Sequence, residues 1–350
     1  MKKLLSVLCA CLALTACEKD DANTIKIGAV LPMTGANAPF GLAMRAGMES
    51  AIKDKGDTKY KYKIVFEDGQ SQAAKSVSAA QKLVSADKVK VLFSHLTATG
   101  RAIAPIAESA NVLNINATLE TENAEPMGKT TFFQGPSVES YHATMMHAMK
   151  TNKVKSVAII AQNVGVSCPG AKAFAGKLNS NGIKATVECF NPGERDFKAI
   201  INKFNKVDAY MVSGFPPESD IVLRALYTSG VKPEKIYGQG IDNGTDLSLY
   251  EGTNCVTPTS GTPEFIARIN KDYTLSNMNL TSAAYDLVSL TVDAFEAVGP
   301  DNMDAVYEYI KKNATRDCMS GTCKLLPNGF IVNEAEWRTY KDGTPVVFER

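Results

Sequence analysis

From residue 25 onward, short apolar segments alternate with amphipathic helical segments, and this order limits the possible folds more than any other feature of the chain. Residues 25–32 and 62–69 are typical of strands. Between them, residues 41–54 place Met44 and Met48 on one face of a predicted helix. Strands that alternate with helices form parallel sheets with helices on both faces. The sequence therefore predicts an α/β fold.

The alternation starts again after residue 136, with a helix predicted over residues 137–150. Further strands are predicted at residues 155–162, 183–190, 208–215 and 235–241. Two series of strands in a chain of 350 residues predict two lobes, each a parallel sheet with helices on both faces. Ligands bind beyond the carboxyl ends of the strands in open parallel sheets. We therefore expect the site in a hinged cleft between the lobes.

The two lobes are expected to exchange segments along the chain. Residues 263–314 carry three consecutive predicted helices, and the residues after them predict short strands joined by Asn-Gly and Asp-Gly turns. We expect hinges near residues 134–137 and 254–258. The expected boundaries are 25–135 plus 257–314 for lobe 1 and 136–256 plus 315–350 for lobe 2.

The first sixteen residues predict a secretion signal peptide. A basic head, Met-Lys-Lys, precedes an apolar run that is too short to span a bilayer as a helix. Residues 14–17, Leu-Thr-Ala-Cys, resemble a bacterial lipobox, in which cleavage before the cysteine leaves a residue that is lipidated. We therefore predict a lipid anchor on Cys17 and a tether over residues 17–24. Two or three acyl chains would hold the protein on a membrane, in the periplasm or at the cell surface.

The charges of the chain are balanced. Lysine plus arginine number 38 and aspartate plus glutamate 37, which gives a formal net charge of +1. Removal of Lys2 and Lys3 with the signal peptide would leave 36 basic residues against 37 acidic ones. No basic stripe is present, so the sequence predicts no nucleic-acid partner.

The cysteines predict two disulfides. Cys318 and Cys323 bracket a Met-Ser-Gly-Thr turn, whereas Cys168 and Cys189 flank one predicted helix and the end of the following strand. Export from the cytoplasm permits both pairs to oxidise. The spacings lack a second close pair of the kind that binds zinc, and the three histidines show no ligand pattern with the cysteines. We therefore predict no metal and no cofactor.

Two loops at predicted strand ends carry hydroxyl groups. After the strand predicted over residues 89–96, Thr97 or Thr99 can cap a helix that starts near Gly100 and presents free N–H groups to the cleft. Thr118 occupies the equivalent place after the next strand. A helix start of this kind binds carboxylates, so hydroxyls and amides from both loops could meet at one anion. Simple helix capping is the alternative role for each threonine.

Several segments follow one another in the order seen in a known family. They are IKIGAVLPMTGANAPFG, VFEDGQSQAAKSVSAAQKLV, VLFSHLTATGRAIAPIAE, GERDFKAIINKFNKVDAYMVSGF and SAAYDLVSLTVDAF, with NGF and DGT near the end. Behind a lipobox, this succession resembles the type I periplasmic binding proteins, specifically the Leu/Ile/Val-binding branch that serves ABC transporters. The resemblance covers residues 25–350 and implies the two-lobed fold of that family.

The resemblance also implies a ligand site. In this family, the loops after the third and fourth strands hold an α-carboxylate, and these loops correspond here to Ala98 with Thr99 and to Thr118 or Thr121. The positions similar to the family's aromatic residues are Phe40, Phe215 and Tyr285. An apolar, aromatic slot is therefore implied. As an alternative, the two phenylalanines could fill the core.

The resemblance leaves the identity of the ligand open. The family's glutamate for the ammonium of an amino acid falls within residues 237–246, where Asp242 could pair with an ammonium or instead cap the next helix. The tyrosine usual in the first loop of lobe 2 falls near Val166, and the first carboxylate hydroxyl falls on Ala98. We therefore expect a small amino acid or a related carboxylate or amide.

The function implied by the resemblance is that of a solute receptor. Such a protein closes its lobes around a ligand, delivers it to the permease of an ABC importer, and is expected to act as a monomer. The sequence contains no G-x-S-x-G, P-loop or H-E-x-x-H motif, so it predicts no enzyme and no catalytic residue. The alternative is a ligand-sensing lipoprotein that signals to a partner without transport.

Overall fold

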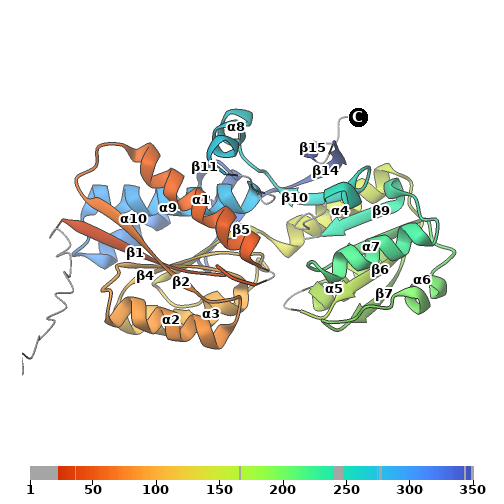
Figure 1. Cartoon of the computed structure of the whole chain (residues 1–350), viewed down its shortest axis with the longest axis horizontal. Helices are drawn as coiled ribbons and strands as arrows, with labels where there is room; N and C mark the ends of the chain where they lie inside the picture. Colours follow the sequence, from red (N-terminus) through yellow and green to blue (C-terminus); the bar gives the residue numbers. More distant parts are fainter. Residues whose placement is uncertain are drawn as a thin grey trace, which may run out of the picture.

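The computed structural model describes residues 23–35, 37–164, 167–239, 247–273, 275, 278–342 and 344–347. Its strands form two sheets, each in a lobe of its own, and the lobes lie side by side (Figure 1). The predicted α/β fold with two mostly parallel, helix-covered sheets is thereby confirmed. Cys17, Val166 and Asp242 lie outside the described residues.

Lobe 1 is built on an eight-stranded sheet with the strand order β11-β12-β13-β5-β4-β3-β1-β2. Its strands are β1 (Thr24–Leu31), β2 (Lys61–Asp68), β3 (Val91–His95), β4 (Leu113–Ala117), β5 (Thr131–Pro136), β11 (Arg316–Cys318), β12 (Gly321–Leu325) and β13 (Phe330–Asn333). Its helices are α1 (Ala38–Lys55), α2 (Ala73–Ser85), α3 (Thr97–Ala110), α8 (Pro263–Asp272), α9 (Met278–Val298) and α10 (Met303–Asn313).

Both faces of the first sheet are covered because side chains of its strands enter cores on both sides. Ile27 of β1 packs with Met44 of α1 and Leu287 of α9, whereas Val30 of the same strand packs with Leu83 of α2. Figure 1 shows α1, α9 and α10 on one face of this sheet and α2 and α3 on the other. The alternation in the sequence thus produces a buried parallel sheet.

Lobe 2 is built on a seven-stranded sheet with the strand order β15-β14-β10-β9-β8-β6-β7. Its strands are β6 (Ser156–Gln162), β7 (Lys184–Phe190), β8 (Ala209–Ser213), β9 (Ile236–Gln239), β10 (Asn254–Pro258), β14 (Ala335–Lys341) and β15 (Thr344–Val347). Its helices are α4 (Val138–Thr151), α5 (Ser167–Ser180), α6 (Lys198–Lys203) and α7 (Glu218–Thr228), with short 3₁₀ turns η1 (Pro233–Lys235) and η2 (Leu247–Tyr250).

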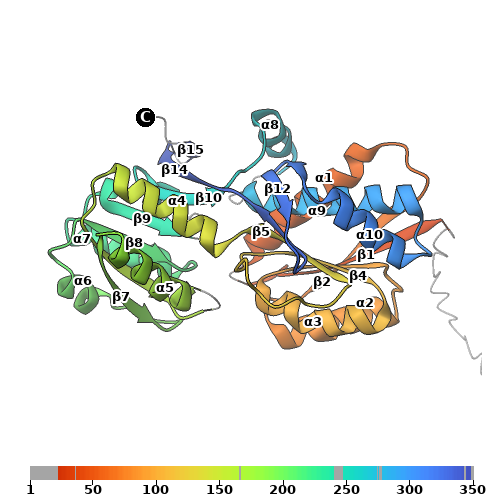
Figure 2. The ribbon, with the colours of Figure 1, turned by 180° about the vertical axis from the view of Figure 1, so that it is seen from behind.

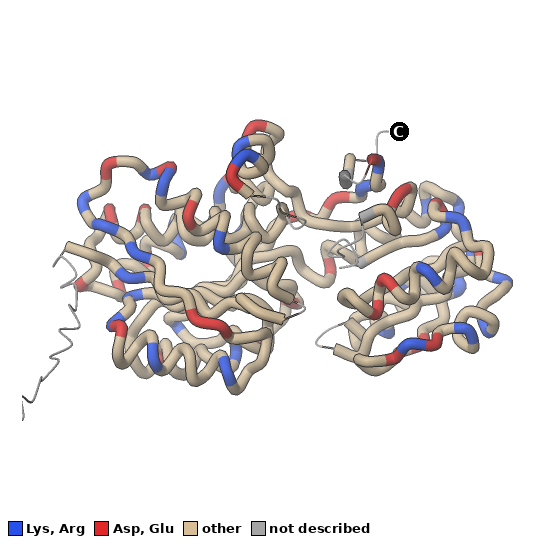
Figure 3. The backbone as a smooth tube through the Cα atoms, in the orientation of Figure 1, with Lys and Arg blue, Asp and Glu red and all other residues tan. Residues whose placement is uncertain are grey.

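The second sheet is covered in the same way as the first. Ile159 of β6 packs in a core with Met145 of α4 and Phe174 of α5, and the next residue, Ile160, packs in another core with Val222 of α7. Lysines and arginines are interspersed with aspartates and glutamates along the backbone of both lobes (Figure 3). None of the helices in the described parts of the chain combines the length and the apolar content needed to cross a membrane.

The strands over residues 316–333 belong to the first sheet, which differs from the expected assignment of residues 315–350 to lobe 2. β13 pairs in parallel with β5, and the rings of Phe330 and Phe133 stack with centroids 5.1 Å apart. The buried side chains of Cys323 and Ile331 complete the core beneath α9. These apolar contacts hold β11, β12 and β13 in lobe 1. Of the strands after residue 315, only β14 and β15 belong to the sheet of lobe 2.

The described chain passes between the sheets three times. β5 leads into α4 at residues 136–138, β10 leads into α8 through residues 259–262, and β13 leads into β14 at residue 334 (Figure 2). The first two passages lie at or beside the predicted hinges. The third lies at residue 334, whereas the expected boundary between the lobes lay at residues 314–315. A few residues at the ends of such elements can act as hinges for the closure of two domains.

A buried carboxylate organises the ends of these connections. Asp286 of α9 accepts hydrogen bonds from the N–H groups of Met319 and Ser320, at 2.7 and 2.8 Å, and from the hydroxyl of Ser320 at 2.6 Å. Burial raises the pKa of Asp286, against the lowering effect of these donors. The Ser320 hydroxyl accepts from Gln134 of β5, and its carbonyl accepts from Asn333 of β13, both at 3.0 Å. One turn therefore contacts the strands that lead into two of the three connections.

Both predicted disulfides are present. Cys168 at the start of α5 is joined to Cys189 near the end of β7, and Cys318 is joined to Cys323 across the β11–β12 turn. The sulfur atoms of the second pair lie within 4.8 Å of a carboxylate oxygen of Asp286, a grouping that could hold a metal ion if the thiols were free. The disulfide consumes both thiols, so this grouping stabilises the turn instead.

Candidate functional site

The two lobes touch through a pair of aromatic rings at the carboxyl ends of their strands. Phe40 lies near the start of α1, after β1, and Phe215 lies between β8 and α7. Their ring centroids are 6.3 Å apart and the planes are inclined by 62°, an edge-to-face contact. The carboxyl ends of both sheets therefore face one another, as the sequence analysis expected for a cleft site.

Phe40 is held at this position by its neighbours. The residue after it is Gly41, where a Cβ atom would lie only 2.2 Å from the carbonyl oxygen of Pro32. Glycine thus allows the first turn of α1 to pack directly against the end of β1. Phe40 itself is only 5% exposed, and its edge meets the ring of His95 with centroids 5.9 Å apart.

His95 ends β3 and forms the inner wall of this aromatic group. Its Nδ1 donates to the carbonyl oxygen of Ala117 on β4 at 2.7 Å, so Nε2 is the acceptor nitrogen of the ring. Burial lowers the pKa of His95 to about 4, although the bond to Ala117 opposes this effect. The imidazole is therefore neutral at physiological pH.

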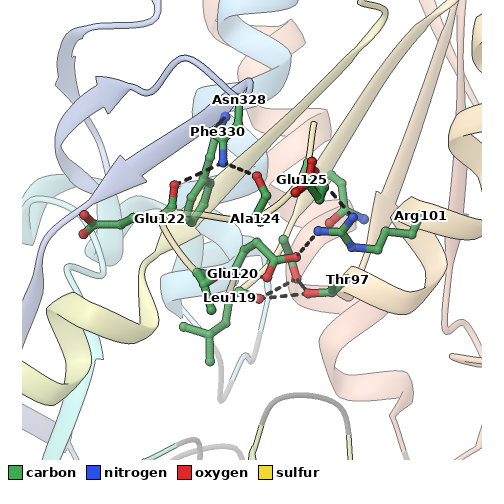
Figure 4. Close-up of polar contacts among 12 residues, drawn as sticks. Thr97, Arg101, Leu119, Glu120, Glu122, Ala124, Glu125, Asn328 and Phe330 are labelled. Atoms are coloured by element: carbon green, nitrogen blue, oxygen red, sulfur yellow. Dashed lines mark hydrogen bonds and ion pairs between the residues drawn. The ribbon is translucent and has the colours of Figure 1, made fainter. Parts of the chain in front are cut away.

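α3 begins beside His95 and brings two hydroxyl groups together. The hydroxyls of Thr97 and Thr118 are 2.9 Å apart. Thr97 also donates to the carbonyl of Leu119 at 2.9 Å (Figure 4). The helix starts at Thr97, three residues before the expected Gly100, and no side chain caps it. Leu96, the residue before it, has a positive φ of 71°. A non-glycine residue in this strained conformation is typical of functional loops.

The first turn of α3 is suited to an anion. The first N–H groups of a helix have no acceptor within the helix, and the helix dipole adds positive charge there. Ala98 is exposed in this turn, whereas Thr99 is only 3% exposed and points into the lobe. The predicted meeting of two loops thus occurs between Thr97 and Thr118.

An ion pair flanks the hydroxyl pair (Figure 4). Arg101 Nη2 lies 2.9 Å from Glu120 Oε2, and the Glu120 side chain is only 5% exposed. The other carboxylate oxygen of Glu120 accepts from the N–H of Thr121, and its backbone carbonyl accepts from the N–H of Val138, both at 2.9 Å. The loop after β4 is therefore fixed to the first connection between the lobes.

The loop after β4 is also fixed to the turn between β12 and β13 of lobe 1. Asn328 Nδ2 donates to the carbonyl oxygens of Glu122 and Ala124, at 3.2 and 2.9 Å (Figure 4). The hydroxyl of Ser137 donates to Glu122 at 2.8 Å. Thr118 therefore lies in a loop whose position depends on the connections that must bend when the lobes move.

On the lobe 2 side, a buried polar group supports Phe215. The N–H of Phe215 donates to Gln162 Oε1 at 2.9 Å, and Gln162 Nε2 donates to Glu218 Oε2 at 3.2 Å. Both side chains are buried, Gln162 at the end of β6 and Glu218 in the first turn of α7. The sequence analysis did not identify them, since neither belongs to a recognisable motif.

Tyr285 lies apart from these residues. Its hydroxyl donates to Asp54 Oδ2 at 3.0 Å, and its ring meets Phe265 of α8 with centroids 5.2 Å apart. Burial, with help from Asp54, raises the pKa of Tyr285 to about 12. Asp54 is near the end of α1 and Phe40 near its start, about 21 Å apart along the helix axis at 1.5 Å per residue.

A cavity of about 570 Å³ opens elsewhere in lobe 2. Its lining includes Asp208, Tyr237 and Asn254, which lie at or before the amino ends of β8, β9 and β10. These ends are opposite the carboxyl ends that meet lobe 1. The cavity is therefore separate from the place where Phe40 meets Phe215, and the chemistry expected at strand carboxyl ends favours that place as the site.

Comparison with known proteins identifies related chains. The sequence model of a family described as periplasmic binding protein matches residues 24–335. The Leu/Ile/Val-binding protein homolog 3 of Brucella melitensis is 28% identical over 241 residues, which cover 66% of this chain and 65% of that protein. The chain therefore spans slightly less than two thirds of the length of this curated relative.

Two solved structures share the fold over nearly the whole chain. The leucine binding protein LivK from Thermotoga maritima has a TM-score of 0.80 and 22% identity, with 93% of this chain and 98% of that chain covered. A solute binding protein of an ABC transporter from Rhodopseudomonas palustris HaA2, in complex with p-hydroxybenzoic acid, has a TM-score of 0.80 and 20% identity, with 93% and 96% covered. The relatives are substrate-binding proteins and not enzymes.

Proposed function

The chain belongs to the periplasmic binding protein family, in its branched-chain amino acid branch, and from this premise we propose that it captures a small carboxylate for an ABC importer. The observation that carries the proposal is the contact between the Thr97 and Thr118 hydroxyls at the first turn of α3. His95, two residues before Thr97, meets the ring of Phe40, and that ring meets Phe215 of lobe 2. Binding requires closure of the lobes and no bond chemistry.

The proposed carboxylate pocket combines two kinds of donor. The first-turn N–H groups of α3, including that of Ala98, supply aligned donors, and Thr118 supplies a hydroxyl that can turn toward the ligand. Arg101 is already paired with Glu120, so the pocket does not present an unpaired guanidinium. The site thus suits a single carboxylate better than a polyanion.

The rest of the ligand would meet apolar and aromatic surface. Phe40 and Phe215 offer ring edges and faces, and neutral His95 offers one acceptor nitrogen. A leucine-like side chain and a substituted benzene ring both suit such a slot. Asp242 is proposed as the partner of an ammonium when the ligand is an amino acid, with helix capping as its alternative role.

We further propose that the protein is an extracytoplasmic lipoprotein. The signal peptide over residues 1–16, the lipidated Cys17 and the tether over residues 17–24 would keep a monomeric receptor close to the permease. The pair of disulfides fits an oxidising compartment outside the cytoplasm.

A thermal-shift screen of the chain without residues 1–17 tests this function. The panel contains L-leucine, 4-hydroxybenzoate, other amino acids, small carboxylates and the amides of the same compounds. A ligand at 100 times its Kd adds about 2.7 kcal/mol to the free energy of unfolding, which is readily seen as a rise in Tm. Stabilisation by an acid and not by its amide supports the carboxylate pocket. Stabilisation by uncharged compounds alone, or turnover of a bound compound, contradicts the proposal.

A further inference from the structure

The backbone of Phe215 is fixed at both of its polar groups. Its N–H donates to Gln162 Oε1 at 2.9 Å, and its carbonyl accepts from the N–H of Ser219 at 3.2 Å. The preceding residue is Gly214, where a Cβ atom would lie 2.9 Å from the Cβ of Gln162. The absence of a side chain at Gly214 therefore permits this close approach. The backbone from which the ring of Phe215 projects cannot shift far unless one of these bonds breaks.

Glu218 determines which end of the Gln162 amide faces Phe215. Gln162 Nε2 donates to Glu218 Oε2 at 3.2 Å, and an ionised carboxylate can only accept. The amide nitrogen must therefore face Glu218, which leaves the amide oxygen for the N–H of Phe215. Gln162 is 4% exposed and Glu218 is 7% exposed, so water competes little for these groups.

Glu218 is itself held by two further elements. Its second oxygen accepts from the N–H of Gly193, in the loop after β7, at 2.9 Å. It also lies in the first turn of α7, where the helix dipole stabilises a negative charge. One carboxylate therefore links the ends of β6 and β7 to the start of α7, just below Phe215.

Gln162 and Glu218 support a contact that joins the two lobes. The ring of Phe215 meets Phe40 with centroids 6.3 Å apart. We infer that Glu218 is a positioning residue that, through Gln162, holds Phe215 against Phe40 and so sets how closely the lobes meet at the ligand site. The importance of this contact for ligand capture rests on the proposed function, but the contact itself does not.

Exchange of an acid for an amide tests the orientation of Gln162. In Glu218→Gln, two amides face each other, so Gln162 can turn and present its NH₂ to the N–H of Phe215, which is repulsive. The reciprocal double variant, Gln162→Glu with Glu218→Gln, restores every bond. The new carboxylate accepts from Phe215 and from the new amide, whose oxygen accepts from Gly193. This exchange moves the negative charge from residue 218 to residue 162. If the structure only needed a charge at residue 218, the double variant would not behave like the wild type.

Two measurements on ligand-free protein follow the effect. Amide hydrogen exchange reports on the N–H of Phe215, and spin labels on Ser78→Cys and Lys206→Cys, both exposed, report the distance between the lobes. We expect Glu218→Gln to speed exchange at Phe215 at least tenfold and to broaden the distances toward longer values. Phe215→Ala should lengthen the distances as well. The reciprocal variant should return both readouts to those of the wild type.

The control is Glu234→Gln, the same substitution at an exposed residue of lobe 2, which should change neither readout. Wild-type exchange and distances in Glu218→Gln would overturn the inference. If circular dichroism shows that Glu218→Gln does not fold, the reciprocal double variant decides the question. It must fold and show wild-type distances between the lobes. Any other result overturns the inference. The distances are measured without ligand, so failure of every solute in the thermal-shift screen would contradict only the proposed function.

Discussion

The ring of His142 stacks on that of Phe174 inside lobe 2, with centroids 4.6 Å apart and planes inclined by 16°. Both ring nitrogens of His142 are buried without a hydrogen-bond partner in the described part of the structure. Burial lowers the pKa of His142 to about 4, with a smaller contribution from the positive charge of Lys177. Protonation would place a charge in an apolar core.

Acid is therefore expected to destabilise the protein through His142. The folded pKa, about 4, is below the unfolded value of about 6.5, so the unfolded chain takes up the proton first. The contribution of neutral His142 to the free energy of unfolding is complete above pH 6.5 and is lost as the pH falls toward 4. Between pH 7.5 and 5 this loss amounts to about 2 kcal/mol of unfolding free energy. Urea unfolding of His142→Leu should show a pH dependence smaller by this amount.

The exposed His147 on the same helix provides the control for this experiment. His147→Gln should keep the pH dependence of the wild type. An identical pH dependence in His142→Leu and the wild type would show that His142 finds an acceptor or solvent when protonated.

The two disulfides are expected to stabilise the fold unequally. Cys168 and Cys189 are separated by 21 residues and Cys318 and Cys323 by 5. Closure of the longer loop removes more chain entropy from the unfolded state, about 3 kcal/mol against about 2 kcal/mol. Paired replacement of each disulfide by serines, followed by urea unfolding, measures both effects. A larger loss from the short loop would show that the turn around Ser320 depends on its disulfide in the native state.

Most of the fold follows from local patterns in the sequence. Strands such as β1 and β6 are continuous apolar runs, and the helices between them have apolar faces, so both lobes could be predicted. The place of β11 to β13 could not be predicted in this way. Their pairing depends on non-local contacts, such as Phe330 on Phe133, which a short alternating strand does not specify.

The candidate site could be predicted in part. The resemblance to a known family gave Phe40 and Phe215, whose rings meet, and the loops after two neighbouring parallel strands gave Thr118, whose hydroxyl meets that of Thr97. Their role in ligand binding stays a prediction. The exact start of α3 was missed, since Leu96 adopts a positive φ that its residue type does not suggest. Gln162 and Glu218 were also missed, because a buried amide and acid reveal their roles only through their partners.

Asp242 gives a prediction that depends on the ligand. If L-leucine binds, Asp242→Ala should weaken it more than tenfold, because the ammonium loses its counter-charge in a closed cleft. If 4-hydroxybenzoate binds, the same variant should leave the affinity unchanged, since that ligand has no ammonium. Isothermal titration calorimetry measures both. Unchanged affinity for L-leucine would assign Asp242 the role of a helix cap.

Cys17 gives a prediction about attachment. Cys17→Ala in the full-length protein should move it from the membrane fraction to the soluble fraction, because the variant cannot carry the acyl chains. Its affinity for the solute should equal that of the wild type, since the tether precedes the first strand. Fractionation with immunoblotting checks the first part. Continued membrane association of the variant would contradict the proposed anchor.

The hydroxyl of Thr118 gives the most direct test of the carboxylate pocket. Thr118→Val keeps the shape of the side chain and removes the hydroxyl, while Thr97 retains its bond to the carbonyl of Leu119. A hydrogen bond to a charged group contributes about 1.5–3 kcal/mol, so the affinity for the stabilising acid should fall roughly tenfold to a hundredfold. Calorimetry on Thr228→Val, at an exposed site of lobe 2, supplies the baseline. Equal affinities in the two variants would place the carboxylate away from α3, because the pocket depends on the Thr97–Thr118 pair.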